Sequence, residues 1–382
     1  MLDDFKKALS AQKHPGMSNH LTLPRLMWQA APFIMSTSGR SHPPLTIYWC
    51  VNSICSMQCK MCDVGNVNPE SNFFKNLSIT GKPEEIPIER FKSIIDDVAP
   101  YRPMISITGT EPLLYKPIGE AISSVRHHGM VIAVTTSGYT LPKRAEELAE
   151  AGLSRLNVSI DGPPKLHNEI RGRKDSFEKA TEGIMQFYEN VRKKGRKTEI
   201  LALCTITNMN YHALEEYYDS LNGLPIDRID FVYMTYVNES MAREHNAFCG
   251  NKYHATVTCL NDDTRPEEVN VEELYNQIRA VKSKAGEKVT FLPDFGINEL
   301  KTYFYEPSKF MRNGRCMVSW FIAQIIANGD VIPFTRCFNI PVGNINEQSF
   351  MEIWNGEKAR AWRRDLRKYG KFPACTRCCQ AY

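Results

Sequence analysis

Three cysteines in one short polar loop are the residues of this chain best suited to metal chemistry. Cys55, Cys59 and Cys62 follow one another at spacings of four and three residues. Thiolates are the ligands that iron–sulfur clusters prefer, and a cubane cluster has four irons. Three cysteines leave one iron open to a small molecule, as at a catalytic metal site. A zinc site would need a fourth ligand, and the nearest histidines, His42 and His20, lie upstream at no recognisable spacing.

The loop resembles the cluster motif of the radical S-adenosylmethionine (SAM) enzymes, C-x3-C-x2-C with an apolar residue before the last cysteine. Met61 holds that apolar position, which in the family lies near the adenine of SAM. The resemblance implies that Cys55, Cys59 and Cys62 bind a 4Fe–4S cluster and that SAM chelates its fourth iron. An electron from the cluster then cleaves SAM, and the 5′-deoxyadenosyl radical abstracts a substrate hydrogen.

A second stretch, Gly109-Thr110-Glu111-Pro112, resembles the family's Gly-Gly-Glu-Pro motif, with Thr110 in place of the second glycine. A backbone carbonyl and a carboxylate there would face the cationic amine of SAM. A glycine lets the backbone approach closely.

Residues at later strand ends also match positions that contact SAM in the family. An arginine suits bidentate recognition of the SAM carboxylate, and hydroxyl or amide side chains suit its ribose. The resemblance implies such contacts for Thr136, Ser137, Ser159, Asp161, Arg171 and Asn208, with Asn210 beside them and His167 as a further candidate in a loop.

Short apolar runs alternate with helix-length amphipathic segments through the first two thirds of the chain. This alternation predicts a parallel sheet with helices around it. The pattern allows a doubly wound sheet or a partial barrel, and the family resemblance implies an open (β/α)6 partial barrel, an α/β fold. Strands are expected at 45–51, 104–107, 131–135, 156–160, 199–206 and 229–233. Residues 64–87 are expected to be a long surface loop, 236–270 a long irregular stretch, and 286–315 a connection to the second group of cysteines.

A second group of cysteines lies near the C-terminus, around a hairpin with the turn Asn328-Gly329-Asp330. Cys316, Cys337, Cys375 and Cys378 could hold zinc or an iron–sulfur cluster. Together with the Gly-Asn-Ile and Ile-Trp pairs, the pattern resembles the SPASM/twitch extension of radical SAM enzymes. This resemblance implies one auxiliary 4Fe–4S cluster, with Cys379 as the alternative to Cys378. The basic helix that follows, ending near 368, is expected to be a solvated face.

The bulk composition limits the class of protein. The chain has 382 residues, of which 42% are hydrophobic and 24% charged, as expected for a soluble globular protein. The net charge of +4 is too small to indicate nucleic-acid or membrane binding. Neither a signal peptide nor a membrane span is readable, so a cytoplasmic location is expected. Disulfides are then not expected. Nine of the twelve cysteines fall in two groups, at 50–62 and 316–379, which indicates two metal sites.

Three regions are expected: an N-terminal lead-in (1–43), a radical SAM core (44–300) and an auxiliary cluster domain (301–382). The lead-in is too short for the leader-binding domain of many peptide-modifying relatives. The leading hypothesis is a radical SAM oxidoreductase that dehydrogenates a small molecule such as an aminocyclitol. His245, His254 and Glu239 are then candidates for the general base. An electron donor such as flavodoxin or ferredoxin would be a partner.

Two alternatives stay open. The first is a maturase of a ribosomal peptide, which forms C–C or C–S bonds or epimerises residues. The second is a non-catalytic iron–sulfur or zinc binding module, which would release no 5′-deoxyadenosine from SAM.

Overall fold

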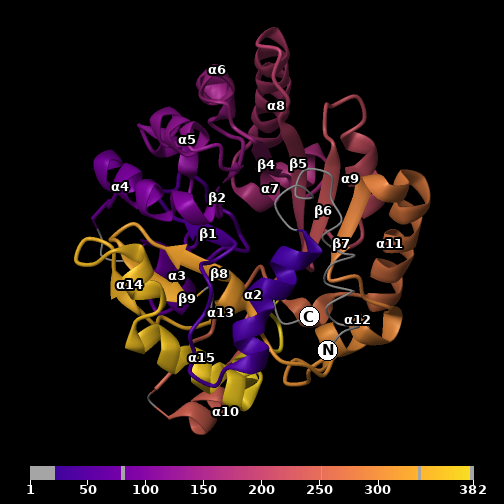
Figure 1. Cartoon of the computed structure of the whole chain (residues 1–382). Coiled ribbons are helices and arrows are strands. Elements are labelled where there is room, and N and C mark those ends of the chain that lie inside the picture. Colours follow the sequence, from indigo (N-terminus) through magenta and orange to yellow (C-terminus); the bar gives the residue numbers. More distant parts are fainter. Residues whose placement is uncertain (1–21, 79–81, 251, 334–336, 379–382) are drawn as a thin grey trace.

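The expected alternation of strands and helices is present in the computed structural model of the chain, which describes residues 22–78, 82–250, 252–333 and 337–378. Within these residues ten strands form one open sheet, in the order β10-β9-β8-β1-β2-β3-β4-β5-β6-β7. Neighbours from β1 to β7 are parallel, and helices surround them, so the α/β partial-barrel prediction is confirmed (Figure 1). The strands are β1 (Thr46–Trp49), β2 (Met104–Ile107), β3 (Ile132–Thr136), β4 (Arg155–Ser159), β5 (Glu199–Ile206), β6 (Arg228–Tyr233), β7 (Val289–Leu292), β8 (Ile322–Ile325), β9 (Asp330–Pro333) and β10 (Gly343–Asn344).

The helices cover the outer face of this sheet because alternate strand residues are apolar and point outward. Trp49 of β1 packs on Phe91 of the helix before β2, with ring centroids 4.4 Å apart, and Phe231 of β6 packs on Tyr217 in the same way. The helices are α2 (Leu23–Met35), α3 (Asn72–Ser78), α4 (Ile88–Val98), α5 (Ile118–His127), α6 (Leu141–Ala151), α7 (Pro164–Arg171), α8 (Ser176–Lys193), α9 (Leu214–Ser220), α10 (Glu239–Cys249), α11 (Val271–Ala285), α12 (Ile297–Tyr305), α13 (Val318–Phe321), α14 (Phe350–Trp354) and α15 (Glu357–Tyr369).

The C-terminal region joins the barrel sheet. β8 pairs in parallel with β1, with Thr46 opposite Ile322 and Trp49 opposite Ile325. The predicted hairpin continues from there, because β9 is antiparallel to β8. The second cysteine group is thus tied to the strand that leads into the first. The predicted boundary at 300/301 falls inside α12, and the three-region division stays a prediction.

Three segments that were expected to be irregular contain regular structure. Residues 64–87 contain α3, whose Phe73 and Leu77 are buried. The prediction that this whole segment is a surface loop was therefore wrong. Residues 236–270 hold α10. A seventh parallel strand, β7, lies where only a connection was expected. α3 and β7 are short, and tertiary packing stabilises short elements that local periodicity does not reveal.

The basic face of α15 is not simply solvated, contrary to expectation. Arg360 and Arg364 donate to the Ser38 carbonyl (3.2 and 3.3 Å), and Arg367 donates to the Ser36 carbonyl (2.8 Å). Arg363 is buried and donates to backbone carbonyls while its guanidinium lies over the Trp354 ring. The arginines therefore hold the chain that follows α2 against the C-terminal region.

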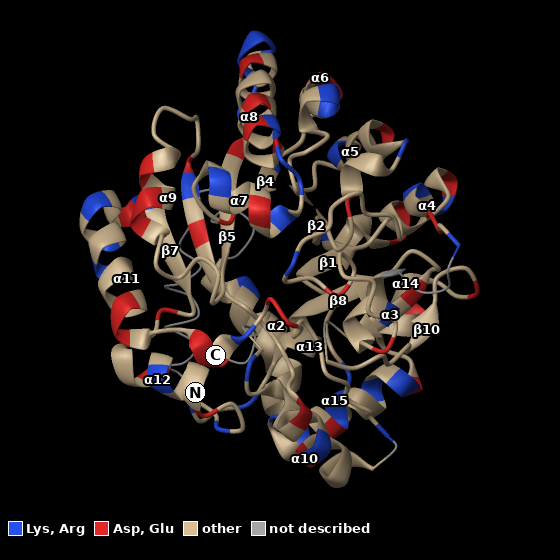
Figure 2. Ribbon diagram, turned by 180° about the vertical axis from the view of Figure 1, so that it is seen from behind, with Lys and Arg blue, Asp and Glu red and all other residues tan. Residues whose placement is uncertain are grey.

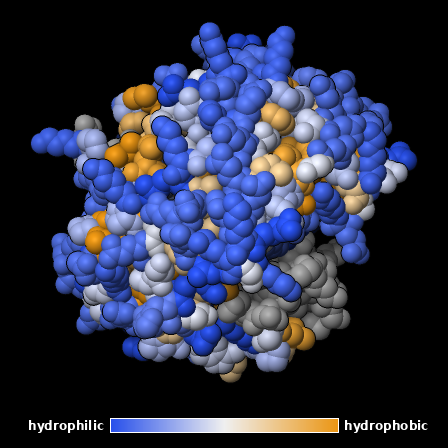
Figure 3. Space-filling view, turned by 90° about the horizontal axis from the view of Figure 1, so that it is seen from above, coloured by the Kyte–Doolittle hydropathy of each residue, from blue (hydrophilic) through white to orange (hydrophobic). Residues whose placement is uncertain are grey.

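Basic and acidic side chains are interspersed along the outer helices, as Figure 2 shows for α8. The face seen from above is mostly hydrophilic, with scattered apolar side chains (Figure 3). Among the described residues, no helix is both long and apolar enough to cross a bilayer.

Candidate iron–sulfur and SAM site

The loop after β1 is hydrogen-bonded to the turn after β2. Asn52 donates from Nδ2 to the Glu111 carbonyl (3.1 Å), and the Glu111 N–H donates to the Ile54 carbonyl (3.0 Å). Thr110 Oγ1 lies 2.7 Å from both the backbone and the side-chain oxygen of Asn52. Adjacent parallel strands end at the same edge of the sheet, and the structure brings the two motifs together there. Asn52 belongs to neither motif, so its role in joining them was not predicted from the sequence.

The Glu111 carboxylate is buried and links β2 to β3. It accepts hydrogen bonds from Thr136 Oγ1 (2.7 Å), Ser137 Oγ (2.5 Å), the Ser137 N–H (3.0 Å) and the Leu113 N–H (3.1 Å). The hydroxyl protons of Thr136 and Ser137 are therefore committed to this carboxylate. A contact of either hydroxyl with SAM, which stays a prediction, would have to use oxygen lone pairs.

Glycines allow the backbone to pack tightly at the site. Gly109 has a φ of +112°, and a Cβ there would lie 2.3 Å from Cys50 Sγ. A Cβ on Gly65 would lie 2.6 Å from the Cys59 nitrogen. Larger residues would displace the loop at both positions.

The three thiols of the loop are near enough to influence one another. Burial raises the pKa of the Cys55 thiol to about 12, and the charges of Glu111, Cys59 and Cys62 add to the rise. Burial also raises the pKa of Cys59 to about 11, against the opposing charge of Arg171. The Cys55 and Cys59 thiols are therefore protonated at neutral pH without metal, and metal binding must release their protons.

The loop fits a cluster in a further respect. The Ser56 hydroxyl is buried without a partner in the described part of the chain, as expected where a bound group is missing from a polar site. No three His, Cys, Asp or Glu side chains in the described ranges meet at a point that would hold one metal ion. Each thiolate of a cubane binds a different iron, so cluster ligands surround a volume instead.

Arg171 connects the cluster loop to the end of β4. Its guanidinium lies 2.5 Å from Asp161 Oδ2 and donates to Cys59 Sγ (3.7 Å). Burial opposes its charge, but Asp161 and Cys59 together raise the pKa of Arg171 above its usual value. The Asp161 carboxylate also accepts from the Thr205 N–H (2.8 Å). Arg171 is thus placed by an ion pair within the chain, and its predicted pairing with SAM stays a prediction.

His167 and Asn210 are buried parts of the framework. His167 lies in α7 and not in a solvated loop: its Nδ1 accepts from the Asp161 N–H (3.0 Å), and Nε2 lies 3.1 Å from Ser176 Oγ. Asn210 donates to the Asp161 carbonyl (2.8 Å). Both side chains therefore fix the backbone at Asp161. The loop placement of His167 was wrong, and its contact with SAM or substrate stays a prediction.

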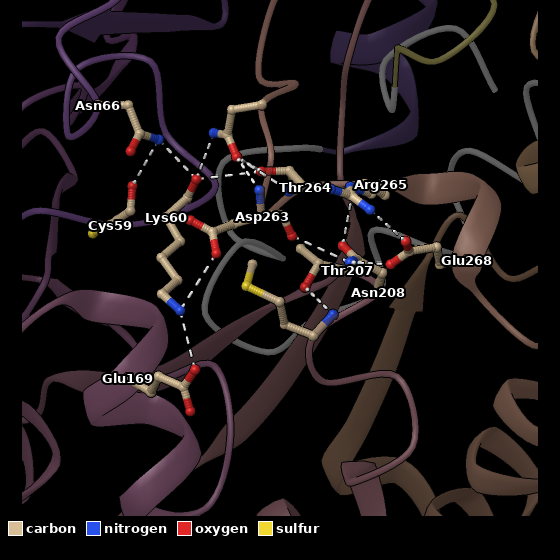
Figure 4. A network of polar contacts seen from close by, with 12 residues as sticks. Cys59, Lys60, Asn66, Glu169, Thr207, Asn208, Asp263, Thr264, Arg265 and Glu268 are labelled. Carbon is tan, nitrogen blue, oxygen red and sulfur yellow. Dashed lines mark hydrogen bonds and ion pairs between the residues drawn. The ribbon is translucent and has the colours of Figure 1, made fainter.

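Asn208 is directed at a segment that the sequence left unassigned. Its Nδ2 donates to the Asp263 carbonyl (3.2 Å) and to Glu268 (3.3 Å), and its Oδ1 accepts from the Arg265 N–H (3.1 Å) (Figure 4). Its predicted contact with SAM stays a prediction. Among the other predicted positions, Met61 is partly buried, Pro112 is buried and Ser159 ends β4 partly exposed.

The second cysteine group gathers around the 3-10 turn Pro373–Cys375. Burial raises the pKa of Cys375 well above its usual value, and the charges of Cys337 and Cys316 add to this. Cys337 Sγ lies 3.5 Å from the Ala374 carbonyl, and the Cys378 N–H donates to the Cys375 carbonyl (3.2 Å). These four cysteines could therefore hold a cluster, and Cys379 lies outside the described residues.

Arg377, between Cys375 and Cys378, attaches this turn to the barrel. Its buried guanidinium donates to the carbonyls of Thr302 (2.7 Å), Glu306 (2.6 Å) and Lys309 (3.0 Å). These carbonyls belong to the last turn of α12 and to the residues that follow it. No motif in the sequence indicates this role.

The three candidates for a general base do not gather at the cluster loop. His245 is buried: its Nε2 lies 2.6 Å from the Tyr253 carbonyl, and its ring stacks on Phe338. Burial lowers its pKa. His254 and Glu239 are exposed. His245 is therefore part of the packing beside the second cysteine group.

The comparisons agree with these two sites. Residues 49–221 match the pattern of the radical SAM superfamily, and residues 316–379 match the iron–sulfur cluster-binding domain called SPASM. The chain therefore contains a radical SAM domain and a C-terminal SPASM domain. Its cofactors are accordingly SAM, a SAM-binding 4Fe–4S cluster and auxiliary iron–sulfur chemistry in the SPASM domain.

Among curated relatives, Fe-coproporphyrin III synthase of Methanosarcina barkeri is 28% identical over 52% of this chain. The chain spans about half the length of this relative, 48%. AdoMet-dependent heme synthase of the same organism is 26% identical over 88% of this chain and 89% of its own. Among solved structures, Streptococcus suis SuiB bound to its precursor peptide SuiA has a TM-score of 0.60 at 14% identity, over 93% of this chain and 75% of that one. This likeness shows the fold.

Proposed function

We propose that this radical SAM enzyme modifies a peptide substrate at the mouth of the barrel. When bound, the cluster and SAM supply the 5′-deoxyadenosyl radical. Cys55, Cys59 and Cys62 hold that cluster, the turn at Gly109–Pro112 binds SAM, and Cys316, Cys337, Cys375 and Cys378 hold the auxiliary cluster. The catalytic part of the proposal rests on one observation: hydrogen bonds join the cluster loop to the turn that contains Glu111.

The inner face of the sheet favours a peptide. Near the cluster loop it presents hydroxyl and amide groups: Asn157 Nδ2 donates to Thr135 Oγ1 (3.0 Å), and Tyr48 and Ser159 are partly exposed. Such groups suit the donors and acceptors of a peptide backbone. SuiB, which shares the fold, was crystallised with a precursor peptide.

The charged groups on that face are already paired. Arg228 lies 2.7 Å from Asp230 and 3.3 Å from Glu199, and Arg155 pairs with Glu199 (2.6 Å). These arginines are therefore committed within the chain, and they begin β4 and β6, at the end of the sheet away from the cluster loop.

A tetrapyrrole is the second candidate substrate. AdoMet-dependent heme synthase and the pre-heme d1 synthase of Dinoroseobacter shibae each match 88% of this chain. The dehydrogenation of an aminocyclitol, expected first from the sequence, gains no support from these relatives, whose reactions vary.

The enzyme is tested by anaerobic iron analysis and by the release of 5′-deoxyadenosine from SAM. Two cubanes predict about eight irons in the chain and about four when Cys55, Cys59 and Cys62 are all replaced by alanine. The variant should release no 5′-deoxyadenosine. An unchanged iron content in the variant would refute the site.

The substrate class is tested with the peptide fraction of the source cells, used before and after digestion by a protease. A peptide substrate predicts stimulated release of 5′-deoxyadenosine that digestion abolishes. Stimulation by Fe-coproporphyrin III, or stimulation that survives digestion, would instead favour the tetrapyrrole or another small molecule.

A further inference from the structure

A segment outside both matched domains closes over the cluster loop. We call residues 258–268 the strap. At its start, Thr258 pairs with Val237, which follows β6, through a hydrogen bond of 3.0 Å. Toward its end, Arg265 and Glu268 bind the side chain of Asn208, which follows β5. The strap is therefore attached at the ends of two strands of the barrel.

The strap holds the cluster loop at the Lys60 carbonyl, midway between Cys59 and Cys62. This oxygen accepts from Asn261 Nδ2 (2.7 Å) and Thr264 Oγ1 (3.2 Å). Asn66, in the loop itself, donates to the same oxygen (2.7 Å). Figure 4 shows Asn66 and Thr264 directed at Lys60 from two sides. Asn261 and Asn66 thus donate to this carbonyl, and the single hydroxyl proton of Thr264 is shared between it and Asn261 Oδ1, which lies 2.8 Å from Thr264 Oγ1.

The strap holds the loop at a second point, directly after its last cysteine. The buried Asp63 carboxylate accepts from the Cys259 N–H (2.9 Å). Cys259 has a φ of +57°, a left-handed conformation that is unfavourable for a residue with a Cβ. The surrounding contacts therefore hold this backbone in place.

The other side of the loop is held by α7. The Lys60 N–H donates to the Ile170 carbonyl (2.9 Å), and Lys60 Nζ lies 3.0 Å from Glu169 and 3.5 Å from Asp263 of the strap. The two backbone groups of Lys60 are thus bound by different elements. Loosening either side would free the half of the loop that ends in Cys62.

We propose that Asn261 and Thr264 are positioning residues for the SAM-binding cluster. By fixing the Lys60 carbonyl they set the direction of the Cys62 thiol and of Met61 beside SAM. The inference rests on Cys59 and Cys62 being cluster ligands, and on nothing about the substrate. It also gives a role to a segment that neither family match includes.

Matched variants separate the hydrogen bonds from the rest of the strap. Thr264→Val keeps the side-chain shape and removes the hydroxyl, whereas Thr264→Ser keeps the hydroxyl. Asn261→Asp keeps the shape and removes the amide donor. Asp262→Asn changes an exposed strap residue and serves as the control. Hydrogen exchange, followed by mass spectrometry on peptides covering 56–63 of the iron-free chain, reports on the loop directly.

Thr264→Val and Asn261→Asp should exchange about threefold to tenfold faster in those peptides, because a hydrogen bond of ordinary strength is lost. Exchange in α8 should be unchanged. After reconstitution, iron content should match the wild type while the KM for SAM rises by a similar factor. Thr264→Ser and Asp262→Asn should behave as wild type.

Wild-type exchange in peptides 56–63 for both donor-removing variants would overturn the inference. Faster exchange in α8 as well would also overturn it, because the residues would then stabilise the whole fold. Should Thr264→Val fail to fold, Asn261→Asp carries the test. The exchange test uses the iron-free chain and does not depend on catalysis. A failure of the proposed function would be detected separately, because the reconstituted wild type would then release no 5′-deoxyadenosine from SAM.

Discussion

Replacing Gly172, which ends α7, with alanine would test how closely the chain packs around the cluster loop. Its φ is +67°, and a Cβ there would lie 2.6 Å from the Gln58 carbonyl oxygen, in the residue before Cys59. Because real Cβ contacts are essentially never under 3.0 Å, Gly172→Ala must move the loop or α7 by about 0.4 Å. Gly195 is a matched control, since its φ is +62° and nothing lies within 4 Å of the added carbon.

The two variants share one free-energy cost and differ in the other. A left-handed alanine costs about 1–2 kcal/mol in either place. Overpacking typically adds about 1–3 kcal/mol, and only Gly172→Ala incurs it. Urea unfolding of the iron-free chains should therefore show Gly172→Ala to be about 1–3 kcal/mol less stable than Gly195→Ala. Iron bound to the SAM-cluster loop after reconstitution should fall only in Gly172→Ala. Equal stability and equal iron in the two variants would refute the close packing inferred here.

Three other results are expected. Arg171→Met leaves the buried Asp161 carboxylate without its cation and should lower the free energy of unfolding by about 3–5 kcal/mol, and the added change Asp161→Asn should recover part of this; strictly additive losses in urea unfolding would contradict the ion pair. Burial lowers the pKa of His167 and His245 below 6.5, so below about pH 6.5 only the unfolded chain binds these protons. The free energy of unfolding should then decrease as the pH is lowered, by at most about 1.4 kcal/mol per pH unit for each ring. In His167→Gln the urea midpoint should depend less steeply on pH between pH 7 and 5; an unchanged dependence would show that His167 does not contribute to it. Arg377→Ala removes the contacts with α12 and should lower iron from about eight to about four while SAM cleavage without substrate persists; full iron retention would argue against this anchor.

The residues with strict chemical requirements could be predicted from the sequence. Cysteines at fixed spacings and a Gly-Thr-Glu-Pro turn after an apolar run define the site by residue type, and parallel strands bring such strand ends together. The six short runs rich in apolar residues were equally readable, because the strand residues that face the covering helices are apolar.

The residues that hold this machinery could not be predicted. Asn52, Asn261 and Thr264 bind backbone atoms far away in the chain, and such contacts depend on the fold and leave no spacing pattern. The arginines of α15 look like an ordinary charged face until their carbonyl partners are known. A run of four residues carries little periodicity, so β2 was predicted whereas β7, of the same length, was missed.

The pairing of β8 with β1 also has a consequence for how the chain matures. β1 immediately precedes the SAM-cluster loop, yet one of its two neighbouring strands comes from residues 322–325. Such a pairing between distant parts of the chain forms late, and until then β1 is an exposed edge that other strands could join. During synthesis the first cluster site is therefore flanked by an incomplete sheet until the SPASM region has emerged. A truncation that removes the SPASM domain would thus also leave the strand that leads to the catalytic cysteines with an open edge.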